Sequence, residues 1–257
     1  MRAYIACTPE ELPAAAGITR FYLHVAYRIG PGSGLLRQSL PQKVQGGLLS
    51  VSDLEAPPVS NPEQLSAAVL RECVRRSFGG AVLDFEAPYR PDLGAFARKL
   101  DGELTAKGRR LYVPPAYGRN TERARVLLCT ALSGGSFQEY LTEAADRWGG
   151  ASRLALDVQR LRMEFRLPAA SGEGKPLSGE EFETLLQELH PQSFFSPELC
   201  ARYFTCSGEG SARFILYDDA STLREKLKIG AALGIEDAFL MWPEIQDLAP
   251  ELRLRQL

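Results

Sequence analysis

The segment GGAVLDFEAPYR, residues 79–90, places two acidic residues in an otherwise apolar, strand-like run. Side chains alternate between the two faces of a strand, so Val82, Asp84 and Glu86 would share one face, and the residues between them the other. Burying carboxylates is costly unless they are paired, hydrogen-bonded or protonated, so folding alone gives no reason for this arrangement. The segment therefore predicts a strand that carries an acidic site.

Strand-like segments alternate with segments of helical periodicity along the chain. Helices are expected over 61–77, 91–108, 136–148 and 222–234. The eight expected strands cover residues 3–7, 22–27, 47–53, 80–86, 110–115, 153–161, 213–219 and 238–243. Strand and helix in alternation predict parallel strands joined by crossovers. The chain of 257 residues is close to the ~250 that eight such units need, so we predict a single α/β domain over 1–257, a closed (β/α)8 TIM barrel.

Two segments do not follow this alternation. RVLLCTAL, residues 125–132, resembles a further strand. We assign it to the connection after the fifth strand, because a ninth strand would exceed the eight strands of a (β/α)8 barrel. Residues 167–211 form an expected insertion between strands 6 and 7, with an amphipathic helix that begins at a capping box of Ser178 and Glu181. Active-site walls of barrels are built at such positions. A lid that only covers the core is the alternative.

Composition excludes several classes of function. Lys and Arg number 30 against 32 Asp and Glu, a formal net charge of -2, so no basic field is available for nucleic acid or an anionic membrane. No stretch approaches the ~18 apolar residues of a membrane helix, and the N-terminus lacks a signal-peptide core. The five cysteines are scattered, without a C-x-x-C pair, which indicates reduced thiols and a cytoplasmic protein. The oligomeric state stays open.

The chain has only two histidines, His24 and His190, far apart in the sequence. No metal-ligand spacing is present, and we predict neither a metal nor a cofactor. Acid-base chemistry would therefore depend on carboxylates. In a barrel, Glu86 would lie nearest the C-terminal mouth, where a carboxylic acid of raised pKa could act as general acid on a glycosidic bond. The alternative is a structural acid pair bonded to loop amides.

At this point the sequence resembles the chitinase and chitinase-like barrels of glycoside hydrolase family 18. GGAVLDFE is similar to the family signature D-G-x-D-x-D-x-E of the fourth strand. LHVAYRI and GLLSVSD resemble its second and third strands. The closing stretch, ILYDDASTLREKLKIGAALGIEDAFLMWPEI, resembles a Y-D-D-x-x-S-x-x-x-K segment that leads through a helix to a strand ending in Trp. The resemblance runs from about residue 20 to residue 247, without the insertion.

The resemblance implies substrate-assisted, retaining hydrolysis of a β-linked glycan that contains N-acetylhexosamine. Glu86 would match the general acid, and Asp84 the residue that orients the acetamido group as it attacks the anomeric carbon. Trp242 would match the aromatic floor beneath the sugar, and a core position at a strand end is the alternative. Tyr117 is a further candidate for substrate binding.

The sequence also departs from the family pattern. Gly79 and Val82 stand where the signature has its first two Asp residues. The sixth strand of the family usually contains M-x-Y-D, whereas this chain has LDVQR, with Asp157 and Gln159 facing the mouth. Gln159 could donate an amide hydrogen bond in place of the phenol. A solvated strand end is the alternative interpretation.

Three functions remain open. The first is a glycosidase whose substrate would be an intracellular oligosaccharide or a spore structure. The second is a catalytically silent chitinase-like barrel that binds carbohydrate or a protein partner. Silent members usually lose the Glu, and this chain keeps Glu86. The third is a barrel enzyme with a substrate other than sugar, because fold does not dictate function.

Overall fold

The computed structural model describes residues 1–38, 44–167, 174–208 and 211–256. Eight parallel strands form a closed barrel, in which β1 pairs with both β14 and β2. The order around the barrel is β1, β14, β8, β7, β6, β5, β4 and β2. The barrel strands are β1 (Arg2–Cys7), β2 (Phe21–Gly30), β4 (Leu48–Ser52), β5 (Gly80–Asp84), β6 (Arg110–Val113), β7 (Arg125–Cys129), β8 (Leu154–Val158) and β14 (Asp237–Met241). The predicted (β/α)8 barrel is confirmed.

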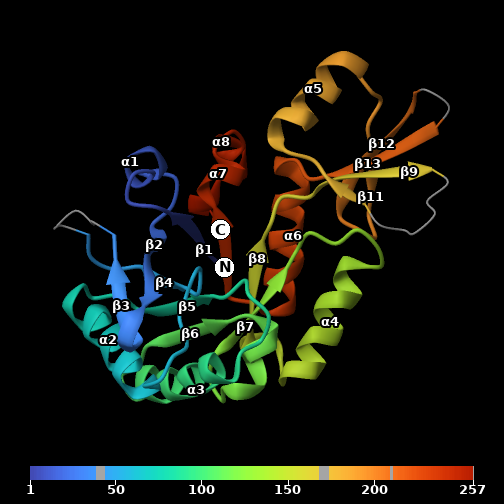
Figure 1. The fold of residues 1–257 in the computed structure, drawn as a ribbon. Helices are drawn as coiled ribbons and strands as arrows, with labels where there is room; N and C mark the ends of the chain where they lie inside the picture. The colour runs from blue at the N-terminus through green and yellow to red at the C-terminus, as the bar shows by residue number, and fades with distance from the viewer. Residues whose placement is uncertain (39–43, 168–173, 209–210, 257) are drawn as a thin grey trace.

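Helices cover the outside of the barrel (Figure 1). All four helices expected outside the insertion are present: α2 (Pro62–Arg75), α3 (Pro91–Thr105), α4 (Phe137–Trp148) and α6 (Ala220–Leu233). The shorter elements are α1 (Leu12–Ala15), η1 (Pro31–Ser33), η2 (Pro115–Asn120), η3 (Ala151–Arg153), α7 (Trp242–Ile245), α8 (Ala249–Leu252) and η4 (Leu254–Gln256). Helix α6 begins earlier than the expected residue 222, at a capping box formed by Asp219 and Thr222, so Thr222 lies inside its first turn.

The predicted strand count was right, but two assignments were wrong. Residues 125–129 form the sixth barrel strand, β7, and not a connection. Residues 211–217, expected as the seventh barrel strand, form β13 in a second, antiparallel sheet. The insertion therefore lies between the seventh and eighth barrel strands, β8 and β14, and not between the sixth and seventh.

The insertion contains a five-stranded antiparallel sheet that stands to one side of the barrel, with helix α5 above it (Figure 1). Its sheet order is β10, β9, β13, β12 and β11. Its elements are β9 (Arg162–Leu167), β10 (Lys175–Pro176), α5 (Gly179–Leu189), β11 (Phe194–Ser196), β12 (Ala201–Gly208) and β13 (Ser211–Tyr217). It begins earlier and ends later than the expected 167–211, of which 168–173 and 209–210 lie outside the described residues. The predicted capping box of Ser178 and Glu181 is present.

Two buried clusters fix which way each barrel strand faces. Val82 belongs to the cluster inside the barrel, together with residues such as Tyr112 and Phe239. Leu83 and Phe85 belong to the cluster between the barrel and its helices. The predicted phase of the strand is therefore confirmed, and the inner face of β5 passes from Val82 to Asp84.

Gly80 allows the backbone at the start of β5 to lie very close to the backbone of β6. Its φ is +155°, and a Cβ atom built there would lie 1.9 Å from the carbonyl oxygen of Arg110. Only glycine tolerates so close a backbone approach at this φ. The glycine of the family signature thus has a packing reason in this chain.

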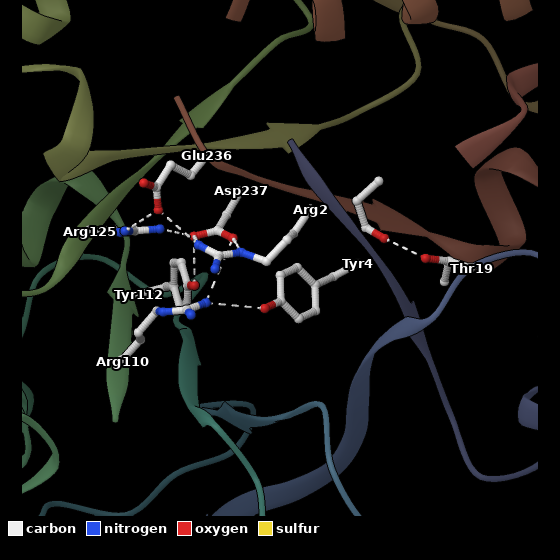
Figure 2. A network of polar contacts seen from close by, with 9 residues as sticks. Arg2, Tyr4, Thr19, Arg110, Tyr112, Arg125, Glu236 and Asp237 are labelled. Carbon is white, nitrogen blue, oxygen red and sulfur yellow. Dashed lines mark hydrogen bonds and ion pairs between the residues drawn. The ribbon is translucent and has the colours of Figure 1, made fainter. Parts of the chain in front are cut away.

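A charged network closes the bottom of the barrel, at the N-terminal ends of its strands (Figure 2). Asp237 is fully buried and accepts hydrogen bonds from Arg2 Nε at 2.6 Å and from the Tyr112 hydroxyl at 2.9 Å. Arg125 also pairs with Asp237. Arg110 lies 3.9 Å from it and donates to the hydroxyl of a further tyrosine. The network joins β1, β6, β7 and β14.

Candidate active site

Acidic side chains gather at the opposite end of the barrel, where its strands terminate. Asp84 ends β5, Asp53 directly follows β4, and Asp157 lies near the end of β8. Glu86 follows two residues after β5. The charges of Glu86, Asp157 and Asp53 all act on Asp84, so the four carboxyl groups lie near one another. We call these four residues the acidic mouth.

Asp84 is the carboxyl group with the most informative environment. Burial is the largest cause that raises its pKa, the neighbouring charges of the acidic mouth act in the same direction, and together they bring the pKa to about 6. A hydrogen bond with the Ser50 side chain opposes this shift. Asp84 therefore changes its protonation state close to neutral pH, as groups at catalytic sites often do.

Asp53 supports Glu86 from the neighbouring strand. The Asp53 side chain is only 5% exposed, and its Oδ1 accepts the backbone N–H of Glu86 at 3.0 Å. Its Oδ2 is buried without a hydrogen-bond partner among the described residues. Asp53 is not among the residues predicted from the sequence, although its place at the end of the strand-like run GLLSVSD was the available signal.

Glu86 itself is exposed, which differs from the expectation of a buried acid. The strand ends at Asp84, so the loop that follows carries Glu86 out of the barrel interior. The next part of this loop is held by Arg90, which donates to the carbonyl oxygens of Ala56 and Pro57, each at 3.0 Å. The loops after β4 and β5 are therefore joined on both sides of Glu86.

Tyr117 belongs to this support and not to the cleft surface. It is 1% exposed, and its hydroxyl accepts the backbone N–H of Arg90 at 3.1 Å. Its ring packs against the rings of Phe85 and Tyr89, with centroids 5.2 Å away in both cases. Tyr117 is therefore packed into the support of this loop, and its contact with a substrate stays a prediction.

Asp157 and Gln159 lie across the barrel. Asp157 shares the inward face of β8 with Ala155, which belongs to the barrel interior, as predicted. Burial raises its pKa, and a 2.7 Å hydrogen bond from Gln159 Nε2 to Asp157 Oδ2 opposes the shift. Gln159 is exposed, but its amide N–H is directed at Asp157.

Trp242 lies at a core position, which was the alternative to a place beneath the sugar. It is 7% exposed and belongs to the core between barrel and helices, with Ala238 and Leu240. Phe239, on the opposite face of β14, points into the barrel. Trp242 begins α7 (Trp242–Ile245) directly after β14 and packs with the outward-facing residues of that strand, and its place beneath a sugar stays a prediction.

A cleft with a volume of about 670 Å³ reaches the acidic mouth. Both Asp84 and Glu86 line it. Its other walls come from β2, β3 (Gly34–Arg37) and the end of β4, and include Arg28, Leu36, Ser52 and Leu54. Val82 lies deeper, in the barrel interior, where an acid would have stood in the family signature. The acids that accompany Asp84 come instead from β4 and β8.

The described residues contain neither a metal cluster nor a membrane span. No group of three His, Cys, Asp or Glu side chains there is arranged to hold a metal ion. In the same part of the chain, every helix is too short or too polar to cross a bilayer.

The fold resembles those of solved chitinases. The chitinase of Chromobacterium violaceum ATCC 12472 is 16% identical, with 99% of both chains covered and a TM-score of 0.67. A family 18 chitinase variant from Cycas revoluta, solved in complex with (GlcNAc)4, is 12% identical over 99% of both chains, with a TM-score of 0.65. The spore cortex-lytic enzyme SleL of Bacillus megaterium QM B1551 is 14% identical over 97% of this chain and 73% of that chain, with a TM-score of 0.64.

No family model matches the sequence, and no curated protein does. The likeness therefore concerns the fold: the chain is a divergent chitinase-like barrel.

Proposed function

We propose that this protein is a glycoside hydrolase that cleaves a β-linked glycan containing N-acetylhexosamine. The observation that carries the proposal is the cleft of about 670 Å³ that Asp84 and Glu86 line together at the C-terminal ends of the strands. Barrel enzymes place their active sites at this end. The likeness to chitinase folds, one of them with (GlcNAc)4 bound, supports a glycan as the ligand.

In the proposed mechanism the acetamido oxygen of the substrate attacks the anomeric carbon. Glu86 donates its proton to the glycosidic oxygen as that bond breaks, and the leaving sugar departs with the proton. Ionised Asp84 stabilises the positive charge that develops on the acetamido nitrogen. Water then attacks the anomeric carbon and opens the cyclic intermediate, and the Glu86 carboxylate accepts a proton from this water. Two successive displacements at the anomeric carbon retain its configuration.

The surroundings of the two acids fit these roles. Glu86 is exposed to the cleft, where a glycosidic oxygen can approach it, and Asp53 holds its backbone. Asp84 is less exposed and is surrounded by other acids, so it exchanges a proton near neutral pH. Positioning of this kind is what general acid-base catalysis requires.

A second candidate function is carbohydrate binding without catalysis. Three observations favour it. Trp242 packs with the core residues between barrel and helices, and the Gln159 amide is already bonded to Asp157. Apolar Val82 likewise offers no hydrogen bond to Asp84. The two candidates differ in whether Glu86 transfers a proton.

Substitution of Glu86 tests the proposal. Glu86→Gln should lower the rate of release from a chromogenic N-acetylglucosaminide or of cleavage of (GlcNAc)4 by roughly 10²–10⁴-fold, the usual contribution of a general acid. Because Glu86 is exposed, the thermal unfolding midpoint should not change. Glu143→Gln, the same substitution at an exposed site on α4, is the control.

The outcomes separate the candidates. Full turnover by Glu86→Gln would contradict its role as general acid. If the unsubstituted protein binds (GlcNAc)4 or a muropeptide but cleaves neither, carbohydrate binding without catalysis is the better account. If it neither binds nor cleaves any glycan of a broad panel, the function lies outside sugars.

A further inference from the structure

One row of side chains crosses the cleft wall in strict register. Leu36 of β3 pairs with Arg28 of β2, Arg28 pairs with Ser52 of β4, and Ser52 pairs with Asp84 of β5. Paired residues on adjacent strands project from the same face. All four line the same cleft. The row thus contains a cationic side chain, Arg28, together with Asp84, the residue of the acidic mouth whose pKa is strongly raised.

Among the described residues, Arg28 has only a weak ion-pair partner. Its Nη1 lies 3.7 Å from Glu55 Oε2, and the two side chains are 54% and 80% exposed. Exposed ion pairs at such distances contribute little and exchange readily with other partners. By contrast, the nearby Arg90, with 26% exposure, is engaged with Asp92 at 2.6 Å and with two carbonyl oxygens. The Arg28 guanidinium is therefore available to a ligand in the cleft.

The register also fixes how far Arg28 lies from the acids. Neighbouring strands are about 4.8 Å apart, so the backbones of Arg28 and Asp84, two strands apart, are separated by about 10 Å. A sugar held at Asp84 would leave Arg28 beside one of its substituents or beside the next sugar. A planar guanidinium there matches a carboxylate in a two-bond fork.

We propose that Arg28 binds a carboxylate on the glycan, so that the substrate class is an acidic N-acetylated glycan and not a neutral one. The proposal rests on the proposed function, since it assumes that a glycan occupies the cleft. It assigns Arg28 to substrate selection and leaves proton transfer to Glu86. A fixed cation also offsets the repulsion that an acidic glycan would meet from the acidic mouth.

Three ligands of equal length test this assignment by calorimetry on the Glu86→Gln variant, which binds without turnover. They are (GlcNAc)4, the same tetramer with lactyl-ether carboxylates on alternate sugars, and that second tetramer with its carboxylates converted to amides. We expect the carboxylated ligand to bind about 10- to 100-fold more tightly than its amide, from one charged two-bond contact. The preference should weaken as salt is raised.

Variants of Arg28 should remove this preference selectively. Adding Arg28→Gln should bring the ratio of the affinities for the carboxylated and amide ligands to about one, and Arg28→Lys should keep part of the preference. Arg98→Gln, an equal charge change at an exposed site on α3, is the control.

A preference that survives Arg28→Gln, or an equal loss for all three ligands, would overturn the assignment. Failure to bind any of the three would overturn it as well. Cleavage of (GlcNAc)4 by the unsubstituted protein, without any carboxylate preference, would overturn this assignment and leave the proposed function standing.

Discussion

Asp84 combines an inward direction, neighbouring acids and a shifted pKa in one residue. Its pKa is raised to about 6 in the folded protein, against 3.8 for the ordinary carboxyl group. Between these values the folded state keeps a proton that the unfolded state has lost. Stability therefore falls as pH rises through the window from about 4 to about 6, and above it the cost of the charged form is complete.

Replacing this charge should stabilise the protein at neutral pH. We expect Asp84→Asn to raise the free energy of unfolding by up to about 3 kcal/mol at pH 7.5 and to change it little at pH 3.5. Urea unfolding at both pH values measures the difference. An equal effect at both values would mean that Asp84 titrates normally in the folded state.

The sequence revealed the site only in part. Strand alternation identified the inward face of Asp84 and Asp157, because period-2 patterning survives in any strand. It could not identify Asp53, whose role depends on a backbone N–H in another loop. The sequence alone could not place Trp242 and Tyr117, because aromatic rings suit both a core and a sugar site and only packing distinguishes them; both rings are buried in the structure.

At the scale of elements, β13 shows why one strand was assigned to the wrong sheet. Its residues Ile215 and Tyr217 pack under α5, while Phe214 and Leu216 pack on the opposite face of the inserted sheet. A strand covered on both faces has the continuous apolar pattern of a barrel strand. The sequence therefore contained nine equivalent strand signals, and choosing eight of them required knowledge of pairing.

A buried ion pair connects the insertion to the barrel. Lys226 Nζ lies 2.8 Å from Asp218 Oδ2, and neither side chain is exposed. Asp218 directly follows β13, and the same oxygen accepts the backbone N–H of Leu161, just before β9, at 3.0 Å. Both stems of the insertion thus meet at one carboxylate. This gives a structural reason for the Asp and Lys of the closing segment.

Removing the Lys226 ammonium group should lower the stability of the protein strongly. Lys226→Met leaves Asp218 buried without its counterion, and we expect a loss of about 3–5 kcal/mol in the free energy of unfolding. Lys228→Met removes a side chain that is 60% exposed on the same helix and should cost less than about 1 kcal/mol. The double variant Asp218→Asn, Lys226→Met should be more stable than Lys226→Met alone. A loss below about 1 kcal/mol for Lys226→Met would contradict this account.

At the scale of the whole molecule, the two ends of the barrel carry opposite chemistry. Acids gather at the C-terminal ends of the strands, around the cleft. Arginines surround Asp237 at the N-terminal ends, where Figure 2 shows the side chains converging. The proposed active site and the buried ion network thus lie at opposite ends of the barrel, and barrels of this architecture usually separate catalysis and stability in this way.

The adjacent acids Asp237 and Glu236 allow a direct test of this network. Asp237→Ala should lower the free energy of unfolding by about 3–5 kcal/mol, because it leaves buried donors and clustered arginines without their acceptor. Glu236→Ala, at a side chain 55% exposed, should cost less than about 1 kcal/mol. Chemical unfolding of both variants at one pH gives the comparison. Equal losses of unfolding free energy in the two variants would show that the stability effect does not depend on the burial of Asp237.

The contact between Arg2 and Asp237 has a consequence for biosynthesis. The two residues are 235 positions apart in the chain, yet they close the seam between the first and last barrel strands. At about 5–20 residues per second, roughly 12 to 47 seconds of translation separate them. During that interval one edge of β1 is unpaired because β14 has not yet been synthesised. The nascent chain can therefore mispair until synthesis is almost complete.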